Sequence, residues 1–399
     1  MATFPVKWYA SDMQGAPNLG DTAAGALTAL LKAVLVTGFG TLTINSLVWD
    51  ATENAAKATI AAGHAYKQDS VIEVSGASPA AYNGEHRVKK VSSTEVWFEL
   101  DGGNPGSAAS GAMSMKVAPL GWTLTHESGD GMVAIYRPTN VSESGNVSLR
   151  IDNTAFSGWT GATYRAYLAK VQLVEDVVDI NTYTLIYEHR WPATKRYSDG
   201  RWDLIGDGQL FYFLPAYAAH SYQPLLMFGY IKSVRPGDRY HAVLGTYPGT
   251  SADDSGRRWD QTFNAAVWAY VYNNLLSFED SGHRVMARPY HQLFGTTTWW
   301  LKGLFGRFGN GMSIPNGSDN AFYMSTDPIM VMENNNHLRG YLPGLVVPYG
   351  NVSAWHRKNF ANLPALPGKI VRFIQATYNE NAMNAAPTLA GFDLTGPWR

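Results

Sequence analysis

Residues 71–100, VIEVSGASPAAYNGEHRVKKVSSTEVWFEL, contain the pattern that decides the fold class. The runs at 71–74 and 95–100 are β-branched or aromatic, which is typical of strands. Between them, Asn83-Gly84 indicates a β-hairpin, because this dipeptide fits the backbone of a tight turn. The stretch therefore predicts short strands joined by turns.

The same pattern extends in both directions and predicts a small all-β module over residues 44–118. Residues 1–43 precede it and include one amphipathic helix. Its apolar positions follow the 3.6-residue period and are Leu27, Leu30, Leu31 and Val34. Asp21 and Thr22 offer capping side chains, and Gly38 is expected to end the helix in the left-handed conformation. We expect this helix to pack on the main body, which makes the module an insertion.

Residues 119–399 form the predicted main body. Four runs suit strands: 132–136, 147–151, 209–214 and 240–244. Residues 264–278 are a candidate second helix, and two subdomains would divide near 250–285. The predicted fold class is mainly β, with a small β-module inserted near the amino terminus of a larger β-rich body that carries one or two helices.

Composition excludes several classes of function. The 399 residues carry a net charge of −1, so no long-range field recruits a polyanion, and we predict no nucleic-acid partner. The chain contains no cysteine, which removes thiolate metal sites and cysteine nucleophiles. Apolar runs are too short for a membrane-spanning helix, so no membrane span is expected.

No motif in the sequence points to catalysis. Phosphate-binding loops, Gly-x-Ser-x-Gly elbows and His-Glu-x-x-His zinc helices do not occur. Glycoside hydrolysis needs two carboxyl groups that face each other across a cleft, and neighbouring residues on a strand point to opposite faces. Three acidic doublets therefore do not provide this geometry and are interpreted as solvated turns: Glu175-Asp176, Asp253-Asp254 and Glu279-Asp280. We therefore predict a protein that is not an enzyme, with no catalytic residue, no cofactor and no metal site.

Aromatic residues are the one compositional excess, with 13 Trp and 22 Tyr. Large rings fill the cores of β-domains, and they also dominate the contact surfaces between proteins. Both interpretations stay open for each single ring. The candidate partner-contact residues are Trp122, Trp299, Trp300, Trp355 and Trp398.

Several segments resemble virion proteins from the tail regions of tailed bacteriophages. The opening segments are KWYASDMQGAP at 7–17 and GALTALLKAVLVTGFG at 25–40. Those of the small module are AGHAY at 62–66, VIEVSGA at 71–77, YNGEHRV at 82–88 and APLGW at 118–122. The later segments are LIGDGQLFY at 204–212, LRGYLPGL at 338–345 and DLTGPWR at 393–399. Together they span nearly the whole chain.

The resemblance implies a structural component of the tail tip or baseplate, located in the virion and made in the host cytoplasm. Its expected partners are other tail and baseplate proteins and further copies of itself, in a trimer or hexamer. One alternative is a receptor-binding protein of the tail that contacts the host cell surface. A weaker alternative is a tail-associated hydrolase.

Overall fold

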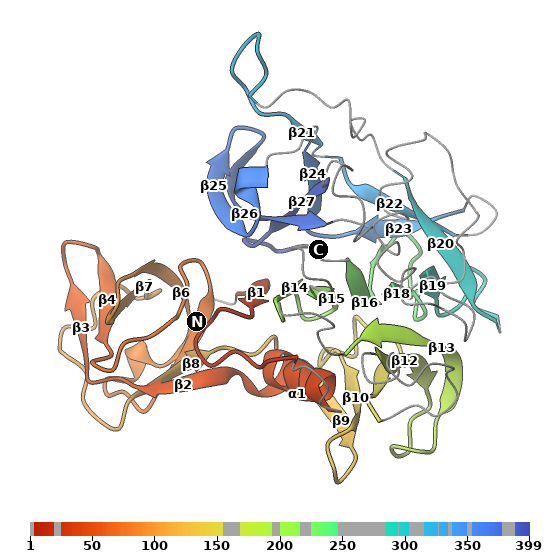
Figure 1. Ribbon diagram of the computed structural model, residues 1–399, viewed down its shortest axis with the longest axis horizontal. Helices are drawn as coiled ribbons and strands as arrows, with labels where there is room; N and C mark the ends of the chain where they lie inside the picture. Colours follow the sequence, from red (N-terminus) through yellow and green to blue (C-terminus); the bar gives the residue numbers. More distant parts are fainter. Residues whose placement is uncertain are drawn as a thin grey trace.

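The computed structural model describes residues 4–19, 25–154, 168–193, 200–215, 225–245, 284–293, 295–302, 315–325, 327–333, 337–348, 353–376 and 388–399. Within these residues the chain is mainly β, as predicted (Figure 1). The described strands pair into one ten-stranded sheet, one seven-stranded sheet and two five-stranded sheets.

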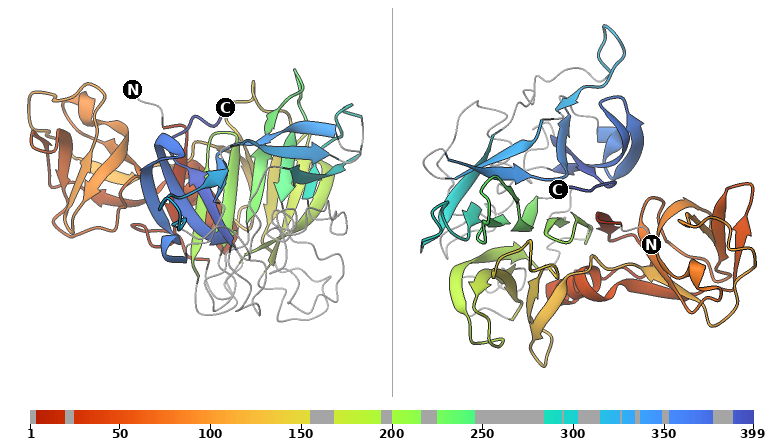
Figure 2. Two further views of the ribbon diagram at one scale, coloured as in Figure 1. Left: turned by 90° about the horizontal axis from the view of Figure 1, so that it is seen from above. Right: turned by 180° about the vertical axis from the view of Figure 1, so that it is seen from behind.

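The seven-stranded sheet takes all its strands from residues 39–117. In spatial order they are β2 (Phe39–Thr43), β8 (Ser114–Val117), β5 (Val71–Ser75), β6 (Gly84–Val91), β7 (Glu95–Phe98), β4 (Ala55–Thr59) and β3 (Ser46–Asp50). The edge strands β2 and β3 are consecutive in the chain, with residues 44 and 45 between them, so the sheet must curl. It stands at one side of the molecule in every view (Figure 2). That it is an independent inserted module stays a prediction.

β5 and β6 form a hairpin, but Asn83-Gly84 is not its tight turn. Val74 pairs with Gly84, and the connecting loop includes the 3-10 helix Ala80–Tyr82. The Asn83 side chain accepts a hydrogen bond from the Ala77 amide (2.8 Å) and donates one to the Ala77 carbonyl (2.7 Å). The asparagine thus closes a longer loop through its side chain, which the dipeptide alone did not indicate.

The ten-stranded sheet forms the centre of the molecule. Its order is β1 (Lys7–Ala10), β14 (Trp202–Gly206), β15 (Leu210–Pro215), β16 (Leu226–Tyr230), β18 (Ala242–Gly245), β19 (Arg284–Met286), β20 (Thr297–Lys302), β22 (Ile329–Glu333), β23 (His337–Leu342) and β17 (Lys232–Ser233). The sheet thus brings β1, from the start of the chain, beside β14. The predicted strands at 209–214 and 240–244 are confirmed here as β15 and β18, within a residue or two.

Two five-stranded sheets complete the body. The first has the order β13 (Thr184–Pro192), β12 (Leu168–Glu175), β11 (Ser148–Asp152), β10 (Val133–Arg137) and β9 (Thr123–Glu127). The second, near the carboxyl end of the sequence, has the order β21 (Met324–Ser325), β24 (Leu345–Pro348), β27 (Thr388–Asp393), β26 (Leu366–Ala376) and β25 (Lys358–Leu363). The predicted strands at 132–136 and 147–151 are confirmed as β10 and β11.

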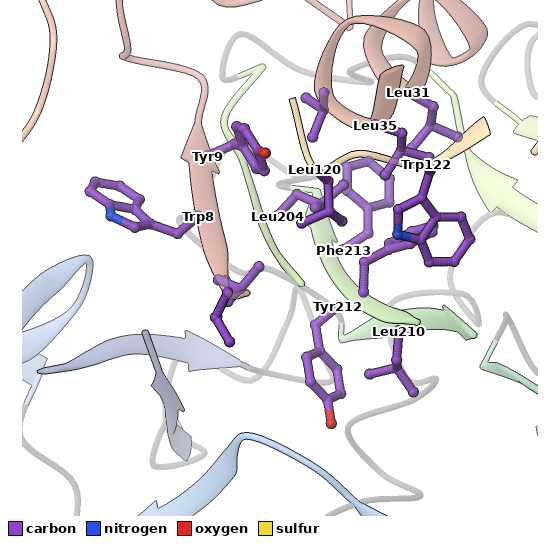
Figure 3. Packing of buried hydrophobic residues seen from close by; sticks show 14 of the residues in the cluster. Trp8, Tyr9, Leu31, Leu35, Leu120, Trp122, Leu204, Leu210, Tyr212 and Phe213 are labelled. Atoms are coloured by element: carbon purple, nitrogen blue, oxygen red, sulfur yellow. The ribbon is translucent and has the colours of Figure 1, made fainter. Parts of the chain in front are cut away.

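These two sheets cover opposite faces of the central strands (Figure 1). Every residue of β15 is buried, and side chains alternate across a strand. Phe211 packs on Trp191 of β13, with ring centroids 6.0 Å apart. Tyr212 packs on Phe392 of β27, with centroids 5.3 Å apart. Figure 3 shows Tyr212 on the side away from α1. The centre therefore has three layers.

The predicted amino-terminal helix is present as α1 (Ala26–Lys32), which continues as the π-helix Ala33–Thr37. The side chains predicted to form its apolar face are buried: Leu27, Leu30, Leu31 and Val34. Tyr136 of β10 donates a hydrogen bond to the Thr28 carbonyl (2.9 Å). The helix therefore lies against the first five-stranded sheet.

The helix ends differ from the prediction. Asp21 and Thr22 lie outside the described residues, and the N-cap is Gly25, which makes no side-chain capping bond. Gly38 has φ 71° and ψ 175°, so it ends the helix in an extended conformation of positive φ instead of the left-handed helical one. The candidate second helix at 264–278 and the division near 250–285 fall largely or wholly outside the described residues.

One junction connects the three layers; we call Trp122, Asp207, Tyr212, Trp398 and Arg399 the inter-sheet junction. The Trp122 indole donates a hydrogen bond to the Asp207 carbonyl (2.9 Å), and Arg399 Nε donates to Asp207 Oδ2 (3.0 Å). On the other face of β15, the rings of Tyr212 and Trp398 lie 5.7 Å apart between centroids. The junction therefore joins segments that are far apart in the chain.

Gly344 is expected to be essential for the position of Trp398. Its φ is 75°, and a β-carbon there would overlap the Trp398 indole ring. Gly344→Ala therefore adds a steric clash to the strain of a positive φ, and we expect it to lower the free energy of unfolding by about 2–3 kcal/mol. Urea denaturation of the purified chain measures this.

Gly103→Ala is the matched control for the backbone strain. Gly103 has φ 68°, and a β-carbon there would meet no atom within 4 Å. The free energy of unfolding of this variant should fall by about 1 kcal/mol, because alanine is strained at a positive φ but meets no steric clash here. If both variants lost the same unfolding free energy, a β-carbon at residue 344 would not disturb the Trp398 ring, and the prediction would be wrong.

Candidate functional site

A polar pocket of about 510 Å³ lies beside Arg399. This volume is in the range of small-molecule binding sites. The walls come from the turn between β14 and β15, from the loop after β10 and from the segment between β16 and β18. The lining residues include Ser142, Glu143, Gln209, Lys232, Arg235, Asp238, Arg239, His241 and Arg399.

The exposed charges of the pocket are mainly positive. Lys232, Arg235 and Arg239 are exposed, and within the described part of the chain their side chains form no ion pair. Glu143 is the exposed carboxylate among the lining residues. The remaining charged groups of the wall are compensated, because Arg399 pairs with Asp207, outside the wall, and Asp238 pairs with an arginine beneath it.

A buried ion triad lies under this wall: Asp238, Arg339 and Glu333. The Arg339 side chain is 1% exposed, and it donates from Nε to Asp238 Oδ2 (2.7 Å) and from Nη2 to Asp238 Oδ1 (2.9 Å). Its Nη1 donates to Glu333 Oε2 (2.8 Å). Burial raises the pKa of Asp238, but the hydrogen bonds from Arg339 outweigh it, so the pKa lies below its ordinary value. Asp238 therefore stays ionised.

The triad fixes the loop that carries the exposed arginines. Asp238 accepts hydrogen bonds from Ser233 Oγ (2.8 Å) and from the Tyr240 amide (3.0 Å). The Val234 amide donates to the Arg339 carbonyl (3.0 Å). Residues 233–240 are thus held at both ends and in the middle, which presets the positions of the loop backbone.

A second ion pair anchors the loop to the neighbouring sheet. Arg288 lies over the Tyr240 ring at 3.8 Å from its centroid and pairs with Glu175 of β12. The interpretation of Glu175-Asp176 as a solvated turn is therefore wrong for Glu175, which is 4% exposed. The sequence could not show this, because its partner is 113 residues away. The other two acidic doublets lie outside the described residues.

His241 forms part of the pocket floor and is neutral at physiological pH. Its Nδ1 is buried without a hydrogen-bond partner and lies 4.0 Å from Asp238 Oδ1. Burial lowers the pKa of His241 from 6.5 to about 4, against the opposing effect of Asp238. The floor therefore carries no positive charge of its own at physiological pH.

The fold should lose stability in mild acid because of His241. The unfolded chain takes up the proton near pH 6.5 and the folded chain near pH 4, so the contribution is complete above 6.5 and is lost between 6.5 and 4. Between about pH 7 and about pH 4.5 this histidine should cost about 2–3 kcal/mol of unfolding free energy. Urea titrations at the two pH values measure the loss.

His241→Phe is the matched variant for the acid effect, since it keeps a ring against Tyr230 and removes the titration. Between the two pH values this variant should lose less unfolding free energy than the parent chain, and the difference should be the value of about 2–3 kcal/mol assigned to His241. His356 has its pKa lowered to about 4 by burial as well, and it titrates equally in both proteins. A variant with the same acid sensitivity as the parent would contradict the assignment.

The structure places two of the predicted contact tryptophans inside the chain. Trp122 is 3% exposed and Trp398 is 8% exposed. Each indole N–H is already bonded within the chain, from Trp122 to the Asp207 carbonyl and from Trp398 to the Asp393 carbonyl. Both rings belong to the inter-sheet junction, on opposite faces of β15. Their positions do not support the predicted contact with a partner.

The other three predicted residues have different positions. Trp299 and Trp300 lie on β20, paired with Glu333 and Met332 of β22, and their side chains are outside what the structure describes. Trp355 is half-buried in an aromatic cluster with Phe322, Phe360 and Phe373. A partner contact by these three stays a prediction.

The pocket was not predicted, although the sequence carries a signal for it. Pro236-Gly237-Asp238 is typical of a turn, and cations lie beside it. Residues 232–239, KSVRPGDR, hold Lys232, Arg235 and Arg239 around that turn. What the sequence could not give is Arg339, the distant partner that neutralises Asp238.

Searches of the described residues and of known proteins add no assignment. Within the described ranges, no group of three or more His, Asp or Glu side chains could hold a metal ion. No helix in the described part is long and apolar enough to cross a membrane. A scan against protein-family models finds no match, and a search of curated proteins finds none either.

Proposed function

We propose that the chain is a structural component of a bacteriophage tail tip or baseplate, which assembles through protein–protein contacts into a symmetric oligomer. The proposal rests on the resemblance of segments spread from residue 7 to residue 399. Its partners would be other tail proteins and further copies of the chain.

The observation that carries the proposal is where these segments lie. APLGW (118–122), LIGDGQLFY (204–212) and DLTGPWR (393–399) supply the inter-sheet junction. LRGYLPGL (338–345) joins them, because Tyr212 donates a hydrogen bond to the Pro343 carbonyl (2.7 Å). Four of the nine segments therefore meet at one place, although they are far apart in the chain. Their meeting supports a resemblance that concerns one shared three-dimensional framework.

The bonding between the layers also suits a component that transmits force within a particle. Asp203 of β14 is fully buried and pairs with Arg357 (2.9 Å), the residue before β25, and with Arg372 (2.7 Å) of β26. Arg288 and Glu175 make a corresponding pair with the first five-stranded sheet. Ion pairs of this kind resist sliding of one sheet over another, since a separated partner would be an uncompensated buried charge.

The pocket favours a second candidate, a receptor-binding protein of the same tail. Structural contacts between subunits do not require a preformed polar cavity, whereas recognition of a small surface group does. The two candidates differ in exposure, because a receptor-binding protein must be reachable at the distal end of the tail.

The test is to locate the protein in particles of the phage that encodes it. Mass spectrometry of purified virions should detect the chain, and antibody against it should label the distal end of the tail in electron micrographs. Inhibition of adsorption by the same antibody would favour the receptor-binding candidate over the structural one. Label on the head, or absence of the protein from virions, would overturn the proposal.

A further inference from the structure

We propose that the pocket beside Arg399 binds a small hydroxylated molecule that carries a carboxylate or phosphate group. The binding groups are the exposed cations Lys232, Arg235 and Arg239. This inference stands on the pocket itself and holds whether or not the proposed function is correct.

Charge determines the class of ligand. Three exposed cations face one exposed carboxylate, Glu143, while Arg399 and Asp238 are neutralised by their own partners. A concave site lined by uncompensated charge of one sign attracts the opposite charge. Guanidinium groups form paired, charge-assisted hydrogen bonds with carboxylate and phosphate. The pocket therefore favours an anion.

Preorganisation strengthens this inference. The loop that bears Arg235 and Arg239 is fixed from below by Asp238, which is 1% exposed at its side chain and bonded at both oxygens. An ion pair buried under a surface loop keeps the loop backbone in one conformation before a ligand arrives. The entropic cost of ordering the backbone on binding is then reduced, although the arginine side chains still have to be ordered.

The remaining wall suits hydroxyl groups on the same ligand. Within the described residues the Glu143 carboxylate has no ion pair or hydrogen bond, so it can accept from a ligand. Ser142 Oγ donates to Asn140 Oδ1 (2.6 Å), so the oxygen of Ser142 keeps acceptor capacity. The volume of about 510 Å³ holds a molecule of monosaccharide size. Sugar acids and polyol phosphates combine these features.

Isothermal titration calorimetry of the full chain tests the proposal with three probes at low salt. D-glucuronate represents the carboxylate source, glycerol 3-phosphate the phosphate source, and D-glucose is the neutral control. At least one anion should bind at least about tenfold more tightly than glucose, and added salt should weaken it. The better anion identifies the source. Equal binding of glucose, or no anion binding up to about 20 mM, would overturn the proposal.

The double variant Arg235→Ala/Arg239→Ala connects binding to these residues. It should bind the better anion at least about tenfold more weakly, since each guanidinium removes charge-assisted hydrogen bonds. Both side chains are exposed, so the melting temperature should not change. Lys358→Ala removes an exposed cation of β25 outside the pocket and should leave binding unchanged. Wild-type affinity in the double variant would overturn the proposal.

Discussion

Replacing Asp203 with asparagine should lower the free energy of unfolding by about 3–5 kcal/mol. Asp203 is 0% exposed and accepts hydrogen bonds from Arg357 Nε (2.9 Å) and Arg372 Nη2 (2.7 Å). The Arg372 side chain is 4% exposed, and burial lowers its pKa against the opposing effect of Asp203. Removal of the carboxylate charge would leave this buried guanidinium uncompensated. Urea denaturation at neutral pH measures the loss.

Asp12→Asn is the matched control for this prediction. Asp12 pairs with the same Arg357, through Nη2 at 2.9 Å, but its side chain is 54% exposed. Water can replace an exposed partner, so this variant should lose less than about 1 kcal/mol. The two variants share the residue type, the substitution and the partner Arg357. Each aspartate also has one further cationic partner, Arg372 for Asp203 and Lys67 for Asp12, so the contrast tests burial as the cause between two ion pairs of similar composition. Similar losses in both variants would refute that cause.

Local features of the fold could be predicted from the sequence. β5 and β6 pair as neighbours in the chain, so their pairing depends on local sequence. Apolar residues that recur with a period of two indicate a strand, and a period of 3.6 indicates a helix, whichever element lies against it. The apolar face of α1 is the clearest case, since all four predicted side chains are buried. The helical segment ends at Gly38, as predicted, but the ψ of Gly38 is extended and not helical, because the backbone angles there depend on the direction in which β2 leaves the helix.

Features that depend on distant residues could not be predicted. Asp203 and Arg372 are 169 residues apart, and Asp238 and Arg339 are 101 residues apart. No spacing rule connects such pairs, because they meet only when the sheets are layered. The same limit applies to Trp122, whose surroundings come from β15 and β16. The neighbours of Trp122 in the chain, a glycine and a threonine, do not indicate whether its ring is buried in a core or exposed at a surface.

Trp122→Ala should lower the free energy of unfolding by about 3–5 kcal/mol, which is typical for removal of a buried large ring. The indole packs edge-on against Phe211 and Phe228, with centroids 5.3 and 5.7 Å apart. Its N–H satisfies the Asp207 carbonyl at 2.9 Å. The truncation would therefore leave a cavity beside β15 and an unpaired acceptor. Urea denaturation of the parent chain and of the variant, at the same protein concentration, measures this fall in unfolding free energy.

Trp122→Phe separates packing from hydrogen bonding. It keeps an aromatic ring in the cavity and removes the donor to Asp207, so we expect a smaller loss of about 1–3 kcal/mol. Sedimentation velocity on the same variants distinguishes the core role from the partner contact suggested by the sequence. Substitution of a core residue lowers the free energy of unfolding, and it weakens association only to the extent that the chain unfolds. If Trp122→Ala weakened association while the unfolding free energy stayed constant, the ring would be a contact residue and the packing argument would fail.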